Sequence, residues 1–248
     1  MTFLTSLLFV IWLYGSMVVL GILWLPALLL PRSATLLGIR TWARAARCGM
    51  KFFCGASTEI RGRENLPKGP AIIGSKHQST MDVLMTFLYL DDPCFILKKE
   101  LMYYPVFGLY AAKARMIAID RAGSTKALKI MAARARDAFE DGRSLVIFPE
   151  GTRLQPGAEP DYKPGIALLY RELGVPCVPV ALNTGYCWPA KGINRYRGHM
   201  VLEIQPAIEP GLDRKTFMSR LKTELEEATA PLLVEGQAAQ NQKRLDAA

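Results

Sequence analysis

The sequence predicts an α/β fold, in which a mostly parallel sheet is flanked by helices and preceded by an N-terminal membrane-associated helical segment. From Ser57 onward, short apolar runs alternate with helical stretches, the pattern of α/β domains with a parallel sheet. Residues 2–31 contain no charged residue. Half of the 248 residues are hydrophobic, and the mean hydropathy is +0.14. We therefore expect a membrane-embedded or interfacial segment over residues 1–55, an α/β domain over residues 56–235 and a polar C-terminal tail over residues 236–248.

The uncharged N-terminal run is longer than the roughly 20 apolar residues that cross a bilayer. Gly15, Gly21 and Pro26 interrupt it, so a single tilted span and a helix bent back within one leaflet both remain open. A cleaved signal peptide fits badly, because no basic region precedes the run. Positive charge begins directly after it, at Arg32, and this asymmetry predicts a cell (inner) membrane protein whose α/β domain lies on the cytoplasmic side.

A second helix is predicted over residues 33–53. Its cations Arg40, Arg44, Arg47 and Lys51 recur at a spacing that places them within one narrow stripe, at about 100° per residue. This pattern favours a helix in the headgroup layer whose cations face lipid phosphates. The alternative is the solvated face of an ordinary helix.

The remaining elements alternate along the chain. Strands are expected over residues 71–74, 94–98, 116–119, 144–148, 178–182 and 200–204. Helices are expected over residues 79–90, 105–114, 124–140, 165–173 and 214–228. The tail beyond residue 236 is rich in Gln and Ala, and we expect it to fray.

The charge and the reactive residues narrow the function classes. The formal net charge of +9 favours nucleic acid, anionic lipid or a phosphorylated substrate as partner. No zinc-finger spacing, aromatic RNP-type strand or long basic run occurs, so nucleic acid ranks last and is not expected as a partner. The chain has five cysteines, an odd number, and none of them forms a CxxC motif. This favours a protein in a reducing compartment over one held by a disulfide framework. The only histidines are His77 and His199, so a histidine-based metal site is not expected.

The segment HQSTMD, residues 77–82, joins an expected buried strand to an expected helix, which is where α/β folds place ligands. His77 is suited to remove a proton near pH 7, and a carboxylate can hold an imidazole in the required tautomer. With Ser79 as the helix N-cap, Asp82 falls on the first turn and can face His77. Ser79 and Asp82 also form a capping box, which needs no catalysis.

A second segment, FPEGTR, follows the strand expected over residues 144–148. Gly151 lets the backbone approach an anion closely, Thr152 offers a hydroxyl, and Arg153 offers a bidentate fork for phosphate. The alternative is a tight turn with a salt bridge between Glu150 and Arg153.

Two further segments end expected strands. Arg121, in the segment IDR, could converge on the same pocket, although an ion pair with Asp120 would explain it equally well. Pro179 interrupts the apolar segment VPVALN, which predicts an edge strand or a bulge beside a groove.

Taken together, HQSTMD, IDR, FPEGTR and VPVAL resemble the motifs of the 1-acylglycerol-3-phosphate acyltransferase family, part of the glycerolipid acyltransferase superfamily, in the same order and at similar spacings. The resemblance covers roughly residues 70–208. One departure is the segment RMIA, residues 115–118, where members often carry a glycine shortly before the IDR block. The resemblance implies the following roles: His77 as the base, Asp82 as its partner, Arg121, Glu150, Gly151, Thr152 and Arg153 as ligands of the substrate phosphate, and Pro179 on the acyl-donor side.

The reaction that the resemblance implies is transfer of a fatty acyl group from acyl-CoA or acyl carrier protein to the sn-2 hydroxyl of lysophosphatidic acid, giving phosphatidic acid. The donor is a co-substrate, and neither a cofactor nor a metal is expected. The expected partners are the lysophospholipid acceptor, the acyl donor and membrane lipids. No GxSxG nucleophile elbow occurs, which agrees with direct attack on an already activated thioester.

Three rival interpretations remain open. The acceptor could be glycerol 3-phosphate, another lysophospholipid or a lyso-aminolipid. A thioesterase would direct the same His–Asp pair at water, and a lipid-binding protein would do no chemistry.

Overall fold

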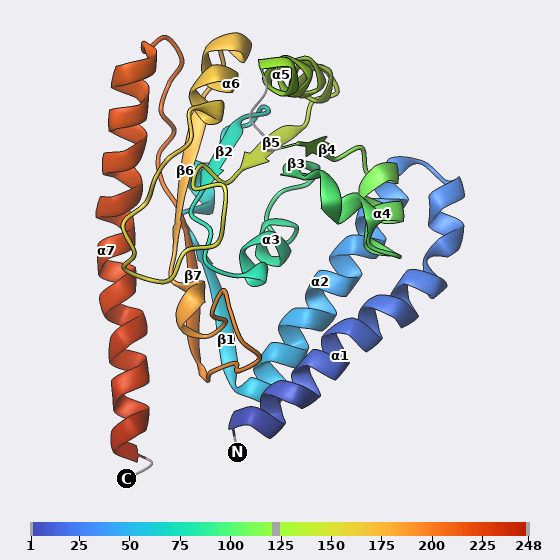
Figure 1. Ribbon diagram of the computed structural model, residues 1–248, viewed down its shortest axis with the longest axis vertical. Coiled ribbons are helices and arrows are strands. Elements are labelled where there is room, and N and C mark those ends of the chain that lie inside the picture. The colour runs from blue at the N-terminus through green and yellow to red at the C-terminus, as the bar shows by residue number, and fades with distance from the viewer. Residues whose placement is uncertain (1, 121–124, 247–248) are drawn as a thin grey trace.

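A computed structural model describes residues 2–120 and 125–246 of the chain. A seven-stranded sheet forms the centre of the domain, with helices on both of its faces (Figure 1). The strands run in the order β1-β7-β6-β2-β5-β3-β4, and all neighbouring pairs are parallel except β6 and β7. The α/β fold class predicted from the sequence is therefore confirmed. The strands are β1 (Ala56–Arg61), β2 (Ile72–Ser75), β3 (Pro93–Lys98), β4 (Ile117–Ile119), β5 (Ser144–Ile147), β6 (Cys177–Leu182) and β7 (Gly198–Ile204).

The two faces of the sheet carry different helices, because successive strand residues point to opposite sides. Ile73 packs into a core with α2, α3 and α4, whereas its neighbour Ile72 packs into a core with α5, α6 and α7. The α-helices are α1 (Thr2–Leu23), α2 (Arg32–Cys54), α3 (Thr80–Thr86), α4 (Phe107–Lys113), α5 (Thr125–Glu140), α6 (Gly165–Leu173) and α7 (Arg214–Asp246). Short 3₁₀ helices are η1 (Leu25–Leu29), η2 (Arg63–Asn65), η3 (Lys99–Tyr103) and η4 (Thr184–Tyr186).

Several elements differ from those expected. Strand β1 was missed, because as an edge strand it carries polar residues on much of its length and lacks an apolar run. Helix α3 ends at Thr86 instead of residue 90. Helix α7 continues to Asp246, past residue 228 and through the segment expected to fray, and it accommodates Pro231 within its length.

The prediction that Pro179 marks an edge strand is wrong. Strand β6 lies between β7 and β2, and Pro179 is paired with Gly74 of β2. The missing N–H is tolerated because the regular ladder with β7 begins only at Val180, while the Pro179 carbonyl accepts a hydrogen bond from Gln205 N at 2.9 Å.

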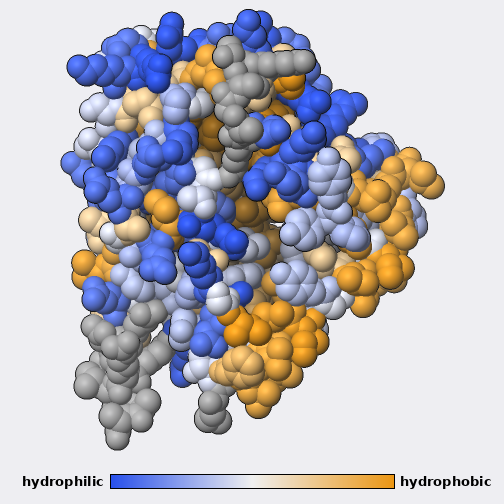
Figure 2. Space-filling view, viewed as in Figure 1, coloured by the Kyte–Doolittle hydropathy of each residue, from blue (hydrophilic) through white to orange (hydrophobic). Residues whose placement is uncertain are grey.

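Helices α1 and α2 form an antiparallel hairpin that packs against the domain (Figure 1). Trp12 Nε1 of α1 donates to the Ala45 carbonyl at 2.9 Å, and Trp42 Nε1 of α2 donates to the Leu13 carbonyl at 3.1 Å. Among the residues that the structure describes, α1 is the one helix long and apolar enough to cross a membrane. Figure 2 shows hydrophobic surface gathered over the region of this hairpin.

The basic stripe of α2 is shorter than predicted. Arg44, Arg47 and Lys51 are exposed, but Arg40 is half-buried and points to the end of α3. Its guanidinium donates to the carbonyls of Phe87 at 3.2 Å and Leu90 at 2.9 Å. The prediction that Arg40 faces lipid phosphates is therefore wrong, because this side chain satisfies carbonyls at a helix end.

Candidate functional site

The segments HQSTMD and FPEGTR meet at the carboxyl edge of the sheet. Strands β2 and β5 are parallel neighbours, so the residues that follow them lie at the same edge. His77 follows β2 and Phe148 follows β5, and their rings stack with centroids 4.0 Å apart at an angle of 17°. The stacking fixes the plane of the imidazole, which stays partly exposed with 16% of its side-chain surface accessible.

Asp82 forms a hydrogen bond with His77, whose ring nitrogen Nδ1 lies 3.0 Å from Asp82 Oδ2. The same oxygen accepts hydrogen bonds from the backbone N–H groups of Gln78 at 2.7 Å and Ser79 at 2.8 Å. Asp82 is fully buried, so the position of its carboxylate is determined by these donors. With Nδ1 donating to a carboxylate, His77 Nε2 is left as the acceptor for a proton.

The capping-box interpretation and the catalytic one describe the same residues. The Ser79 hydroxyl accepts a hydrogen bond from Met81 N at 3.0 Å, and Asp82 caps the Ser79 N–H in return. Capping fixes Asp82 on the first turn of α3, and from that position it reaches His77. The helix start therefore serves as the scaffold of the His77–Asp82 pair.

A third residue holds Asp82, and it was missed in the sequence. Thr184, at the start of η4 after β6, is fully buried and donates its hydroxyl to Asp82 Oδ1. The Ser79 hydroxyl lies 2.9 Å from both Asp82 Oδ1 and the Thr184 hydroxyl. The sequence did offer a sign of this role, because Thr184 follows an apolar run that forms a buried strand, and that strand ends at the same edge of the sheet as β2.

Glu150 lies directly behind His77 and does not face a ligand. Its Oε2 accepts a hydrogen bond from the His77 backbone N–H at 2.7 Å, and its Oε1 lies 2.8 Å from Lys76 Nζ. Lys76 Nζ also lies 2.8 Å from Glu226 Oε1 of α7. Burial raises the pKa of the Glu150 carboxyl, and the Lys76 ammonium opposes that effect. These contacts give Glu150 a role in positioning the His77 loop and do not support the predicted role as a phosphate ligand.

The last two residues of FPEGTR, Thr152 and Arg153, do face outward. Gly151 has φ +68°, in the left-handed region that glycine adopts without strain, and this turn brings the two following side chains to the surface. Thr152 and Arg153 are exposed, and Arg153 donates to the Thr80 hydroxyl at 3.3 Å at the start of α3. Arg153 thus lies on the same loop cluster as His77. Arg121 lies outside the described residues.

Arg195 is a buried cation that was not predicted. It is 9% exposed, and its guanidinium carbon lies 4.7 Å above the Trp188 ring. Among the described residues its Nε has no hydrogen-bond partner. Burial lowers the pKa of Arg195.

The remaining candidates lie elsewhere. Pro179 is buried within β6 beneath the site. His199 is on β7, where its Nε2 lies 2.8 Å from Glu59 Oε2 and its Nδ1 lies 2.8 Å from the Ser57 hydroxyl. Since both ring nitrogens of His199 are engaged on the far strands of the sheet, His77 is the histidine placed for chemistry.

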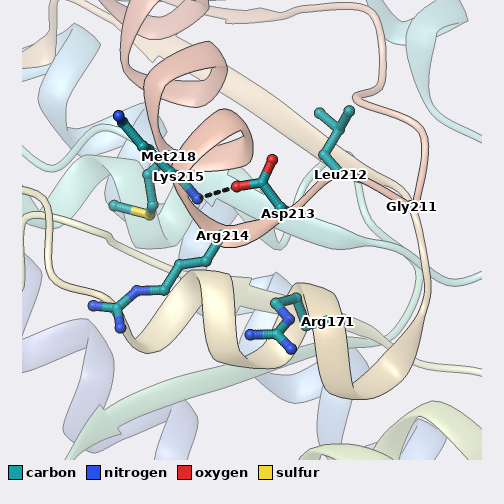
Figure 3. A pocket seen from close by; sticks show the side chains of 7 residues that line it. All are labelled: Arg171, Gly211, Leu212, Asp213, Arg214, Lys215 and Met218. Carbon is teal, nitrogen blue, oxygen red and sulfur yellow. Dashed lines mark hydrogen bonds between the residues drawn. The ribbon is translucent and has the colours of Figure 1, made fainter.

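One surface hollow, of about 860 Å³, is remote from His77. It is lined by Arg171, Arg214 and Lys215 among others (Figure 3). Asp213 accepts a hydrogen bond there from Lys215 N at 2.8 Å and so caps α7. This hollow lies at the amino edge of the sheet, because α6 ends there before β6 begins. A second hollow of about 420 Å³ lies between Gln155, Pro160 and α7, behind Glu150.

Comparison with known proteins supports the motif assignment. Residues 57–183 match the family described as Acyltransferase. The chain is 36% identical over 170 residues to the 1-acyl-sn-glycerol-3-phosphate acyltransferase of Pseudomonas aeruginosa, covering 68% of this chain and 66% of that one. It is 31% identical over 162 residues to the 1-acyl-sn-glycerol-3-phosphate acyltransferase alpha of Homo sapiens, covering 64% of this chain and 57% of that one. The match thus spans somewhat less than two thirds of each relative.

The fold also has a counterpart among solved structures. The crystal structure of the 1-acyl-sn-glycerophosphate (LPA) acyltransferase PlsC from Thermotoga maritima superposes with a TM-score of 0.72 at 24% identity. The superposition covers 93% of this chain and 100% of that one. The shared fold therefore includes most of the chain, beyond the part that matches the family.

Proposed function

The chain belongs to the Acyltransferase family, and on this premise we propose that it transfers a fatty acyl group from an acyl thioester to the sn-2 hydroxyl of lysophosphatidic acid, giving phosphatidic acid. The observation that carries the proposal is the His77–Asp82 pair, with Nδ1 and Oδ2 3.0 Å apart and Nε2 left to act. The relatives named for 1-acyl-sn-glycerol-3-phosphate support the choice of acceptor.

In the proposed mechanism, His77 Nε2 removes the proton of the acceptor hydroxyl as its oxygen attacks the thioester carbonyl. The buried Asp82 carboxylate stabilises the imidazolium that forms, and it does so without moving, because backbone N–H groups already hold it. The C–S bond then breaks, and the thiolate that leaves takes the proton back from His77. The products are the acylated lipid and a free thiol.

Purified protein incubated with acyl-CoA, with and without lysophosphatidic acid, tests this function. New phosphatidic acid that forms only with the acceptor present is the expected result. Free fatty acid formed at the same rate without acceptor would indicate a thioesterase, and no product in either reaction would indicate a lipid-binding protein. Repeating the reaction with glycerol 3-phosphate and lysophosphatidylcholine tests the choice of acceptor, and repeating it with acyl carrier protein identifies the donor.

Substitution of Arg153 by Ala should selectively lower kcat/KM for acceptors that carry a phosphate. A hydrogen bond to a charged group contributes about 1.5–3 kcal/mol, so kcat/KM for lysophosphatidic acid should fall about 10- to 100-fold. An acceptor without phosphate, such as monoacylglycerol, should be much less affected. Arg136→Ala is the matched control, because Arg136 is an exposed arginine of α5 paired with Glu172. Equal losses for both acceptors would count against a phosphate contact at Arg153.

We further propose that the α1–α2 hairpin embeds in the cytoplasmic leaflet of the cell (inner) membrane and brings the site to its lipid acceptor. Both ends of α1 touch the domain: the Ser6 hydroxyl accepts from Arg195 N at 2.7 Å, and the Gly21 carbonyl accepts from the Tyr110 hydroxyl at 2.7 Å. Such a helix lies along the domain, which favours the bent-back form over a free span. Its outward face is apolar, with Leu4 and Ile11 each 60% exposed.

The triple variant Arg44→Gln, Arg47→Gln, Lys51→Gln should weaken binding to anionic vesicles. Each cation near such a surface contributes about 1 kcal/mol, so the loss should approach about 100-fold at low ionic strength and shrink as salt is added. Flotation of the protein with vesicles containing phosphatidylglycerol measures it.

A matched control for this variant removes the same charge from the opposite edge of the sheet, at Arg171, Arg214 and Lys215 (Figure 3). If both triple variants lose the same affinity, the stripe on α2 has no special role.

A further inference from the structure

The segment η3–α4 (Lys99–Tyr103 and Phe107–Lys113) presents large apolar and aromatic side chains that the domain leaves uncovered. Leu101, Tyr103, Tyr104 and Leu109 are 37%, 74%, 61% and 58% exposed. Leaving four such side chains of one short segment in water is unfavourable, and their exposure favours a site of interaction.

This segment is attached to the hairpin. Val106, between η3 and α4, packs so tightly on α1 that a Cβ at Gly21 would lie 2.4 Å from Val106 Cγ1. The buried hydroxyl of Tyr110 donates to the Gly21 carbonyl of the same helix at 2.7 Å. Val106 has φ +63°, a conformation that β-branched residues rarely adopt. The segment η3–α4 therefore lies against the C-terminal end of α1, beside the bend of the hairpin (Figure 1).

The chemistry of the cluster fits a lipid surface. Tyrosines are enriched where hydrocarbon meets headgroups, because the ring is apolar and the hydroxyl is polar. Lys99 is exposed directly before the cluster, where it can meet lipid phosphates, whereas Lys98 Nζ lies 3.5 Å from Glu100 Oε1. Strand β3 ends at Lys98, at the same carboxyl edge as His77.

We propose that η3–α4 is a second membrane-contacting element, which inserts Leu101, Tyr103, Tyr104 and Leu109 into the headgroup region of the bilayer. This inference rests on the proposed embedding of the hairpin. With contacts on η3–α4 as well as α1, the domain cannot rotate about the hairpin axis. The edge that carries His77 then faces the lipid from which the acceptor comes.

Depth-dependent fluorescence tests the proposal on the full chain. Cys48 is the exposed cysteine and the other four are buried, so Cys48→Ser provides a background for single labelling. An environment-sensitive fluorophore is attached in separate proteins at Tyr104→Cys, at Ile11→Cys on α1, and at Val234→Cys, which is 69% exposed on α7. Each protein is bound to phosphatidylcholine–phosphatidylglycerol vesicles, with and without brominated acyl chains, and flotation verifies that it is bound.

The expected result is a shift of emission to shorter wavelength and loss of intensity to the brominated lipid at residues 104 and 11, with neither change at residue 234. Quenching at residue 11 together with aqueous emission at residue 104 would overturn the proposal while leaving the role of the hairpin intact. Aqueous emission at both residues would overturn the hairpin's embedding and this inference with it.

Discussion

Replacing His77 with Ala should lower kcat for acyl transfer by on the order of 10²–10⁴-fold, the contribution of a general base. The fold should survive, because His77 lies in a loop before α3 and is partly exposed. His199→Ala is the matched control, since it removes the other histidine and its bonds to Glu59 and Ser57 on the far strands. It should leave turnover near that of the unmodified enzyme.

Turnover with saturating acyl-CoA and detergent-dispersed acceptor measures this effect, together with Tm for both variants. A His77→Ala protein that turns over at the unmodified rate would contradict the assignment of the base. A large fall in Tm for that variant would show that the imidazole also supports the fold through its stacking on Phe148.

Asp82→Asn should have the second largest effect, because it removes charge while preserving the helix cap. The carboxamide oxygen can replace Oδ2 toward the backbone N–H groups of Gln78 and Ser79. Its NH₂ group can donate to the Ser79 and Thr184 hydroxyls, which are able to reverse their own roles. The imidazolium loses its counter-charge, so kcat should fall on the order of 10²–10⁴-fold with little change in acceptor KM.

Thr184→Val provides a graded comparison for this substitution. It deletes one hydroxyl donor to Asp82 and keeps the carboxylate, so we expect about a 10-fold loss of kcat, comparable with one hydrogen bond to a charged group. If Asp82→Asn is fully active but unfolds at a lower temperature, Asp82 acts only as a helix cap.

The parts of the site that are local in sequence could be predicted. The His77–Asp82 contact joins residues five positions apart, and the capping geometry that produces it is determined by the first turn of one helix. The buried strands were predictable in the same way, because a short apolar run between turns needs no partner to be identified.

Long-range partners could not be predicted, because they depend on the order of strands in the sheet. Glu150 was expected to bind a phosphate. Its carboxylate instead forms an ion pair with Lys76, which lies at the end of a neighbouring strand. Arg40 was expected to face lipid phosphates. Its guanidinium instead donates hydrogen bonds to carbonyls at the end of α3. In both residues the side chain suits either role, and only the tertiary fold decides between them.

The one visible departure from the family's motifs has a backbone explanation. Arg115 stands in the segment where members often carry a glycine, and it has φ +51°. A left-handed conformation costs a non-glycine residue of order 1–3 kcal/mol. The turn is held by Arg143, which is 1% exposed and donates to the carbonyls of Arg115 at 3.0 Å and Ala114 at 2.9 Å.

Direct transfer to the acceptor hydroxyl is the central claim, and intact-protein mass during turnover tests it most directly. The enzyme is mixed with acyl-CoA, with and without lysophosphatidic acid, and the reaction is quenched at times shorter than one turnover. The mass of the intact protein is then measured by mass spectrometry. Direct attack predicts that the protein mass never changes while phosphatidic acid accumulates in the sample with acceptor. A covalent adduct with the mass of the acyl chain, formed without acceptor and consumed when lysophosphatidic acid is added, would contradict it.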